Sequence, residues 1–296
     1  MPIRPTKEQS TGVSHASHEI AWKSWRISLI GIAIAGLYYR VLWKLAIDWW
    51  HIPDFSHGLL VPPFAAYLVW VKKDAICAIK STPSWGGIPL IGLGLGTLLL
   101  GEYGAELYLA RISLIIVLAG LLVTFGGWEL SKEFRFILLL LLLAIPIPAI
   151  VFNQITLPLQ NLASRAASAL LPLFAVPVLR EGNIIELPSM NLEVAEACSG
   201  IRSLMSLFTL SVLYGYFMEV SRSRRIALAL FSIPIAIVAN AARILGTGLC
   251  VQYWDPDKAV DFFHEFSGWV IFIVSIGCLV VMHRLISHLP MRRRET

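Results

Sequence analysis

Charged residues are scarce in this sequence. They make up 15% of the 296 residues, against about 25% in an average soluble protein, while 57% of the residues are hydrophobic and the mean hydropathy is +0.72. This composition excludes a water-soluble globule. Since a membrane span takes about 20 apolar residues, roughly seven to nine spans would use most of the apolar residues and leave little chain for a soluble domain.

Cysteine is sparse as well, and no CxxC pair occurs. Of the four cysteines, Cys77, Cys250 and Cys278 lie beside or inside apolar stretches, where a cysteine is usually a small core residue. This pattern argues against a disulfide framework and against a zinc site, so we expect neither a metal nor an organic cofactor. The fourth cysteine, Cys198, has different neighbours.

The N-terminal segment lacks the apolar stretch and cleavage site of a secretory signal, so residues 1–26 are predicted to be a cytoplasmic tail. The net charge of +5 could indicate a nucleic-acid partner. In a polytopic protein, however, Lys and Arg usually accumulate in cytoplasmic loops. We therefore interpret the excess of Lys and Arg as a sign of membrane topology. We expect the chain to be surrounded by a lipid bilayer and to bind no nucleic acid.

Eight apolar runs indicate an all-α polytopic membrane protein with about eight transmembrane helices. The runs cover about 27–43, 58–71, 86–101, 107–126, 136–151, 203–218, 226–252 and 265–282. The second and third runs are short and rich in proline or glycine, so either could be re-entrant. We divide the chain into the tail, a transmembrane domain over 27–288 and a basic cytoplasmic tail over 289–296.

The distribution of basic residues tests this count. With the N-terminus inside, the inside segments hold 16 Lys and Arg and the outside segments hold 5; the other three of the 24 lie within spans. This asymmetry favours eight spans with both termini cytoplasmic. The long joint over 152–202 is then external. Its first part has helical apolar spacing and predicts an interfacial amphipathic helix, and its second part, around the turn residues 181–183, predicts a small hairpin or three-stranded flap.

Three reactive side chains fall at the predicted outer ends of three spans. Cys198 precedes the sixth span and His264 lies where the eighth begins. Arg243 comes 19 residues after Arg224, at the inner start of the seventh span, which is about 28 Å along a helix and close to the outer edge of a roughly 30 Å core. One thiol, one guanidinium and one imidazole are thus expected at one depth.

These three groups suit nucleophilic acyl transfer. A helix N-terminus beside a cation lowers the pKa of a thiol, and Cys198 has the first of these locally. His264 could then protonate the leaving amine and activate the second nucleophile, while Arg243 could hold the oxyanion or the substrate carbonyl. Ser199 and Gly200 leave room for substrate. Taken singly, the cysteine could be a core residue, the arginine could reach to the interface, and the histidine could be an interfacial residue beside aromatics.

Other candidate residues have two interpretations each. Three of them, Asp54, Ser56 and His57, lie in the first predicted external loop. They could line the site or form a packed polar loop. Asp261, one turn before His264, could orient the imidazole or cap the helix. Arg202, one turn after Cys198, could be a second cation or could pair with Glu193 or Glu196.

Five segments of the sequence resemble the motifs of the exosortase/archaeosortase family, in the family's order. They are Asp54-Phe55-Ser56-His57-Gly58 with Leu60-Val61-Pro62, Pro146-Ile147-Pro148, Glu193 to Ser203 around Cys198-Ser199-Gly200, Asn240-Ala241-Ala242-Arg243-Ile244, and His264 to Gly268. The resemblance covers roughly residues 45–285. It implies a bacterial exosortase in the inner membrane, in the short form without an extra C-terminal soluble domain.

The resemblance also implies a function and its residues. Cys198 would be the nucleophile, Arg243 the clamp and His264 the acid and base, with Asn240 among the supporting residues and the site on the periplasmic face. The substrates would be exported proteins with a C-terminal Pro-Glu-Pro motif, a transmembrane helix and a basic cluster, in bacteria that make exopolysaccharide. The alternative is a transporter or scaffold of a polysaccharide export system, in which Arg243 and His264 serve an ion or sugar path.

Overall fold

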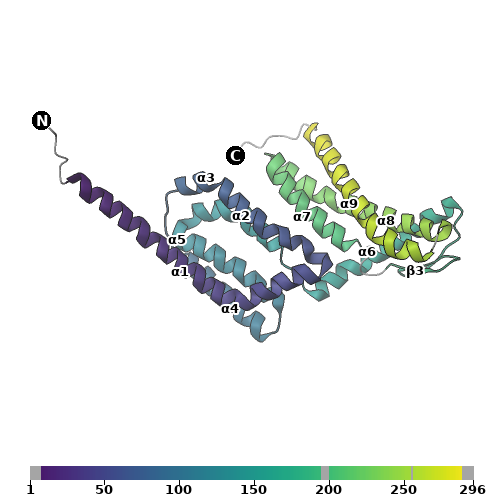
Figure 1. The fold of residues 1–296 in the computed structure, drawn as a ribbon, viewed down its shortest axis with the longest axis horizontal. Coiled ribbons are helices and arrows are strands. Elements are labelled where there is room, and N and C mark those ends of the chain that lie inside the picture. Colours follow the sequence, from purple (N-terminus) through teal and green to yellow (C-terminus); the bar gives the residue numbers. More distant parts are fainter. Residues whose placement is uncertain (1–7, 195–199, 255, 289–296) are drawn as a thin grey trace.

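A computed structural model describes residues 8–194, 200–254 and 256–288, and it describes side chains over 28–192, 194, 200–254 and 266–288. The helices are α1 (Glu8–His51), η1 (Pro53–Leu60), α2 (Val61–Val71), α3 (Lys73–Ala78), α4 (Gly87–Tyr103), α5 (Leu107–Leu143), α6 (Ala149–Leu170), η2 (Leu171–Phe174), α7 (Ile201–Met218), α8 (Arg222–Tyr253) and α9 (Pro256–His288). Helices α1 to α5 form one side of the molecule, and α6 to α9 with a small sheet form the other (Figure 1).

Within the described ranges, five helices are long and apolar enough to cross a membrane. They are Ser28–His51 of α1, α5, α7, α8 and Phe266–His288 of α9. The chain is therefore a multi-pass helical membrane protein. The predicted count of eight spans is not confirmed, because α2 has 11 residues and α4 has 17, which is fewer than a membrane span takes.

Helix α5 contains a reversal of the chain at Gly127. Gly127 has φ +83°, which is not helical. Arg111 near the start of α5 pairs with Asp48 of α1, and the Trp49 indole donates to the Ala144 carbonyl at 2.7 Å. Arg111 and Ala144 are 33 residues apart and would be about 50 Å apart on a straight helix. Since both meet adjacent residues of α1, the two halves of α5 run back to back.

Small residues bring α4 and the first half of α5 together. Gly87, Gly94 and Gly101 recur every seven residues on α4 and are buried. A Cβ on Gly94 would lie 2.6 Å from Val117 Cγ2, and one on Gly101 would lie 2.9 Å from Ala110 Cα. Such a seam of small residues is a common way for helices to approach closely in a membrane. The glycines of the third apolar run thus serve packing between helices.

The helix and the small sheet predicted for residues 152–202 are both present. Strands β1 (Leu179–Glu181), β2 (Ile184–Glu186) and β3 (Asn191–Glu193) form an antiparallel sheet in the order β1-β2-β3. Ile185 of β2, with Leu187 and Val194 just after β2 and β3, is buried against Ala167 of α6 and Val251 of α8. The sheet is therefore fixed in a core rather than projecting freely, and it holds the chain just before residue 195.

Helix α6 buries its small and polar face. Thr156, Gln160 and Ala163 are buried, whereas Ile155 and Leu162 are more than 40% exposed. The apolar face that the sequence pattern identified is thus turned outward, where lipid can cover it.

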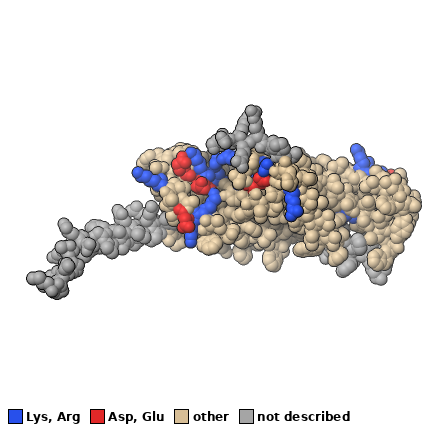
Figure 2. Space-filling view, turned by 90° about the horizontal axis from the view of Figure 1, so that it is seen from above, with Lys and Arg blue, Asp and Glu red and all other residues tan. Residues whose placement is uncertain are grey.

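Charged groups of both signs cluster over one face of the molecule, seen from above in Figure 2. The Lys72 ammonium lies 2.8 Å from a Glu133 oxygen, and Glu219, which is 8% exposed, receives His283 at 3.1 Å and Arg224 at 3.8 Å. These residues belong to the segments that the charge asymmetry assigns to the cytoplasm. The contact between Glu219 and His283 joins the far end of α7 to the far end of α9. The contact between Glu219 and Arg224 joins the start of α8 to both.

The reversal at Gly127 predicts a specific cost for Gly127→Ala. The side chain would have to adopt a positive φ, and its Cβ would fall on the Thr82 carbonyl oxygen. We expect a loss of about 1–3 kcal/mol, measured as a lower thermal midpoint in detergent. Gly92→Ala on α4 is the control, because a Cβ there meets nothing within 4 Å. Equal midpoints for the two variants would contradict the reversal.

Candidate active site

Two of the candidate residues lie outside the described residues and two are described by backbone alone. Cys198 and Ser199 belong to the segment 195–199, which the structure does not describe. Asp261 and His264 lie in α9, and their side chains are not described. The site is therefore built from the residues that adjoin these positions in the chain.

Gly200 begins α7 in tight contact with α8. It is buried and has φ +78°, a left-handed conformation that glycine adopts readily. A Cβ at this position would lie 2.6 Å from Cγ and 2.8 Å from Cβ of Asn240. Only a residue without a side chain fits here. At Gly200 the chain therefore enters α7 directly against Asn240, which is itself buried.

Arg243 lies on α8 less than one turn after Asn240, and it contacts α9. A Cβ on Gly268 would lie 3.4 Å from Nη2 and 3.5 Å from Cζ of Arg243, so the guanidinium packs on the face of this glycine. Gly268 follows His264 by four residues, which is one helical turn. Helix α8 thus contacts both other helices near the predicted catalytic positions. Asn240 contacts Gly200, two residues after Cys198, and Arg243 contacts Gly268, four residues after His264.

The first external loop reaches the same helix start. Arg202 Nε, in the first turn of α7, donates to Asp54 Oδ1 of η1 at 3.3 Å. The Asp54 side chain is 15% exposed and that of Arg202 is 47% exposed. Next to this pair in the chain, Phe55 and Ile201 pack with Phe152 in one buried cluster. The structure gives Arg202 a partner that the sequence did not offer, the aspartate 148 residues earlier. The predicted partners Glu193 and Glu196 cannot be compared with it, because their side chains lie outside the described residues.

The side chains of the other two loop candidates are hydrogen-bonded to backbone carbonyls. Ser56 Oγ donates to the carbonyl of Pro53 at 2.8 Å, within its own turn. His57 is 8% exposed, and its Nε2 donates to the Leu143 carbonyl at the end of α5 at 3.4 Å. Burial lowers the pKa of His57, and the backbone contacts to Leu143 and Asp54 offset this only in part. His57 is therefore packed against the end of α5, whereas Ser56 is exposed and contacts only its own turn.

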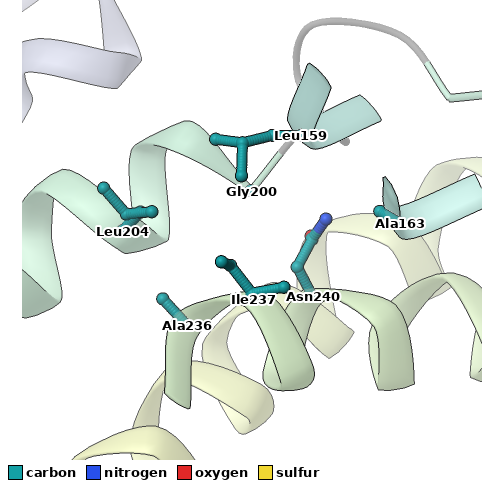
Figure 3. A pocket seen from close by; sticks show the side chains of 7 residues that line it. All are labelled: Leu159, Ala163, Gly200, Leu204, Ala236, Ile237 and Asn240. Carbon is teal, nitrogen blue, oxygen red and sulfur yellow. The ribbon is translucent and has the colours of Figure 1, made fainter. Parts of the chain in front are cut away.

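Sequence reasoning missed a small pocket beside Gly200. Seven residues of three helices line it: Leu159 and Ala163 of α6, Gly200 and Leu204 of α7, and Ala236, Ile237 and Asn240 of α8 (Figure 3). Its enclosed space has room for about one water-sized group. Small residues on all three helices are the only sequence signal for it, and they are common in membrane helices.

The described residues include no cluster of three or more His, Cys, Asp or Glu side chains that could hold a metal ion.

Comparison with known proteins gives the family. The sequence model of the transmembrane exosortases matches residues 49–281, which reach from the end of α1 through most of α9. The chain belongs to the transmembrane exosortase family. No curated protein and no solved structure gives a significant match. The region matched to the exosortase family contains every candidate residue named above, those on the external loop included.

The buried His57 predicts a loss of stability in acid. Its folded-state pKa lies below the ordinary value of 6.5, so the unfolded chain binds a proton more readily. Its contribution is complete above about pH 6.5 and is lost as the pH falls toward the folded-state pKa. We expect His57→Gln to flatten the fall of the thermal midpoint below about pH 6.5. The control is His51→Gln, because His51 is exposed. An unchanged slope in His57→Gln would contradict the assignment.

Proposed function

We propose that this exosortase is a membrane-embedded cysteine endopeptidase or transpeptidase that processes the C-terminal sorting signal of exported proteins, in a system linked to exopolysaccharide. The observation that carries the proposal is the convergence of α7, α8 and α9. Gly200 packs on Asn240, and Arg243 packs on Gly268. Each contact lies within one turn of a predicted catalytic position, and both lie inside the region matched to the family.

The proposed reaction proceeds through a thioester. The Cys198 thiolate attacks the carbonyl carbon of the scissile peptide bond, and the electron pair of the carbonyl moves to its oxygen. Arg243 stabilises this oxyanion. When the oxyanion collapses, the C–N bond breaks and His264 gives a proton to the leaving amine. Water or an acceptor amine then attacks the thioester, gives its proton to His264, and releases the thiolate.

The surroundings of the site support a reactive thiol. Cys198 precedes the N-terminus of α7, whose partial positive charge favours a thiolate. Arg202 and Arg243 add two cations on that side, and Asp54 balances the first of them. The Asp54–Arg202 pair also ties the loop η1 to the first turn of α7, so we assign these two residues a positioning role. Asp261 is proposed to orient His264.

We place the site at the periplasmic face of the bacterial inner membrane. The 16 to 5 asymmetry of basic residues supports this orientation. The substrate's transmembrane helix would dock between the spans, with its Pro-Glu-Pro motif at the interface beside the sheet formed by β1 to β3. The basic cluster of the substrate would then stay in the cytoplasm.

The direct test is Cys198→Ala with a tagged substrate followed on a gel in membranes. We expect no processed product, and for Cys198→Ser a loss of at least about a hundredfold, because a serine lacks the easily formed thiolate. Cys250→Ala is the matched control, since this thiol lies seven residues after Arg243 on α8 and packs against the buried cluster beside the sheet. Normal processing by membrane-inserted Cys198→Ala would overturn the proposal in favour of the transporter or scaffold.

Arg243→Lys tests the role of the guanidinium. Lysine keeps the charge but loses the planar fork that packs on Gly268, so we expect processing to fall by about a hundredfold while the protein stays folded. Arg165→Lys, at an exposed position of α6, is the control and should process normally. Full activity in Arg243→Lys would remove the clamp from the mechanism.

A further inference from the structure

We propose that the pocket between α6, α7 and α8 is a specificity subsite, which binds a small apolar side chain of the substrate next to the scissile bond. This inference rests on the proposed function and adds to it a statement about substrate sequence. It predicts that one residue beside the cleaved bond must be about the size of alanine.

The position of the pocket carries the first step. Gly200 forms part of its wall, and Cys198 is two residues earlier in the chain. Two residues of extended chain span at most about 7 Å. A peptide whose carbonyl carbon is attacked at Cys198 therefore has its adjacent side chains within reach of this pocket. Figure 3 shows Gly200 on the α7 side, facing Asn240 and Ile237 on α8 across the pocket.

The shape of the pocket carries the second step. Ala163 of α6 and Ala236 of α8 are buried in its wall, so each contributes only a methyl group where a larger residue would fill the space. The enclosed part of the pocket has room for about one water-sized group. A methyl group fits there, whereas a branched or aromatic side chain would displace the walls.

The chemistry of the wall carries the third step. Six of the seven lining residues are apolar, and the seventh, Asn240, offers the one polar side chain. Water in such a space would have too few polar partners, so burial of an apolar side chain is the favourable occupancy. A charged or strongly polar side chain would lose its hydration without compensation. The pocket is also partly open rather than sealed, as an entry for substrate requires.

The test is a substrate panel in which single residues around the cleaved bond are changed to Ala, Leu or Phe, and processing by membranes is quantified. With the wild-type enzyme, we expect one position at which Ala is processed at least about tenfold faster than Leu or Phe. Leu204→Ala enlarges the pocket and should shift the preference at that position toward Leu. Ala236→Leu fills it and should lower processing of the Ala substrate by at least about tenfold.

The control variant is Val238→Leu, because Val238 is 68% exposed on the same helix and does not line the pocket. It should keep the wild-type preference. If Ala236→Leu fails to fold, Leu204→Ala alone decides the matter, since a widened subsite gains a substrate rather than losing one. An unchanged preference in Leu204→Ala would show that the pocket is only a packing void and would overturn the inference. Processing by Cys198→Ala in the same membranes would instead overturn the proposed function.

Discussion

The contact between Gly200 and Asn240 is the constraint on which the rest of the site depends. Because Gly200 has a left-handed φ and no side chain, α7 can begin directly against α8. Arg243, also on α8, contacts Gly268 of α9, so α9 packs against α8 through a second glycine. Two close approaches without intervening side chains gather residues that lie up to 68 positions apart in the chain. A membrane protein with little soluble chain can build a site in this way.

Polar pairs at both ends keep the three helices in register. At the site, the Arg202–Asp54 pair ties α7 to η1. At the far end, the buried Glu219 carboxylate follows α7 and receives His283 of α9 and Arg224 of α8. Removing a partner of the buried Glu219 carboxylate leaves its charge uncompensated and costs several kcal/mol, so this cluster resists sliding of α7, α8 and α9 along one another. The Arg202–Asp54 pair, whose arginine is 47% exposed, contributes less. The site depends on such fixed register because its parts come from separate helices.

Periodicity and charge predicted the helical membrane class, the helix that follows the fifth apolar run and the small three-stranded sheet. They could not give the reversal at Gly127, because a glycine within an apolar run looks the same whether the helix continues or turns back. They also could not tell which face of α6 is buried, since in a membrane the apolar face can meet lipid. The pairing of Arg202 with Asp54 depends on a contact across 148 residues, and no local pattern reports it.

Cross-linking tests the central claim, that the starts of α7 and α9 meet beside Arg243. In a chain with Cys77, Cys250 and Cys278 replaced by alanine, His264→Cys would leave two thiols, at positions 198 and 264. The account predicts that mild oxidation or a short thiol cross-linker joins them in membranes. Ser275→Cys, about 16 Å further along α9, should not be joined to Cys198. The contradicting result is that, in His264→Cys, the thiols at positions 198 and 264 each react with a thiol reagent but are never cross-linked to one another.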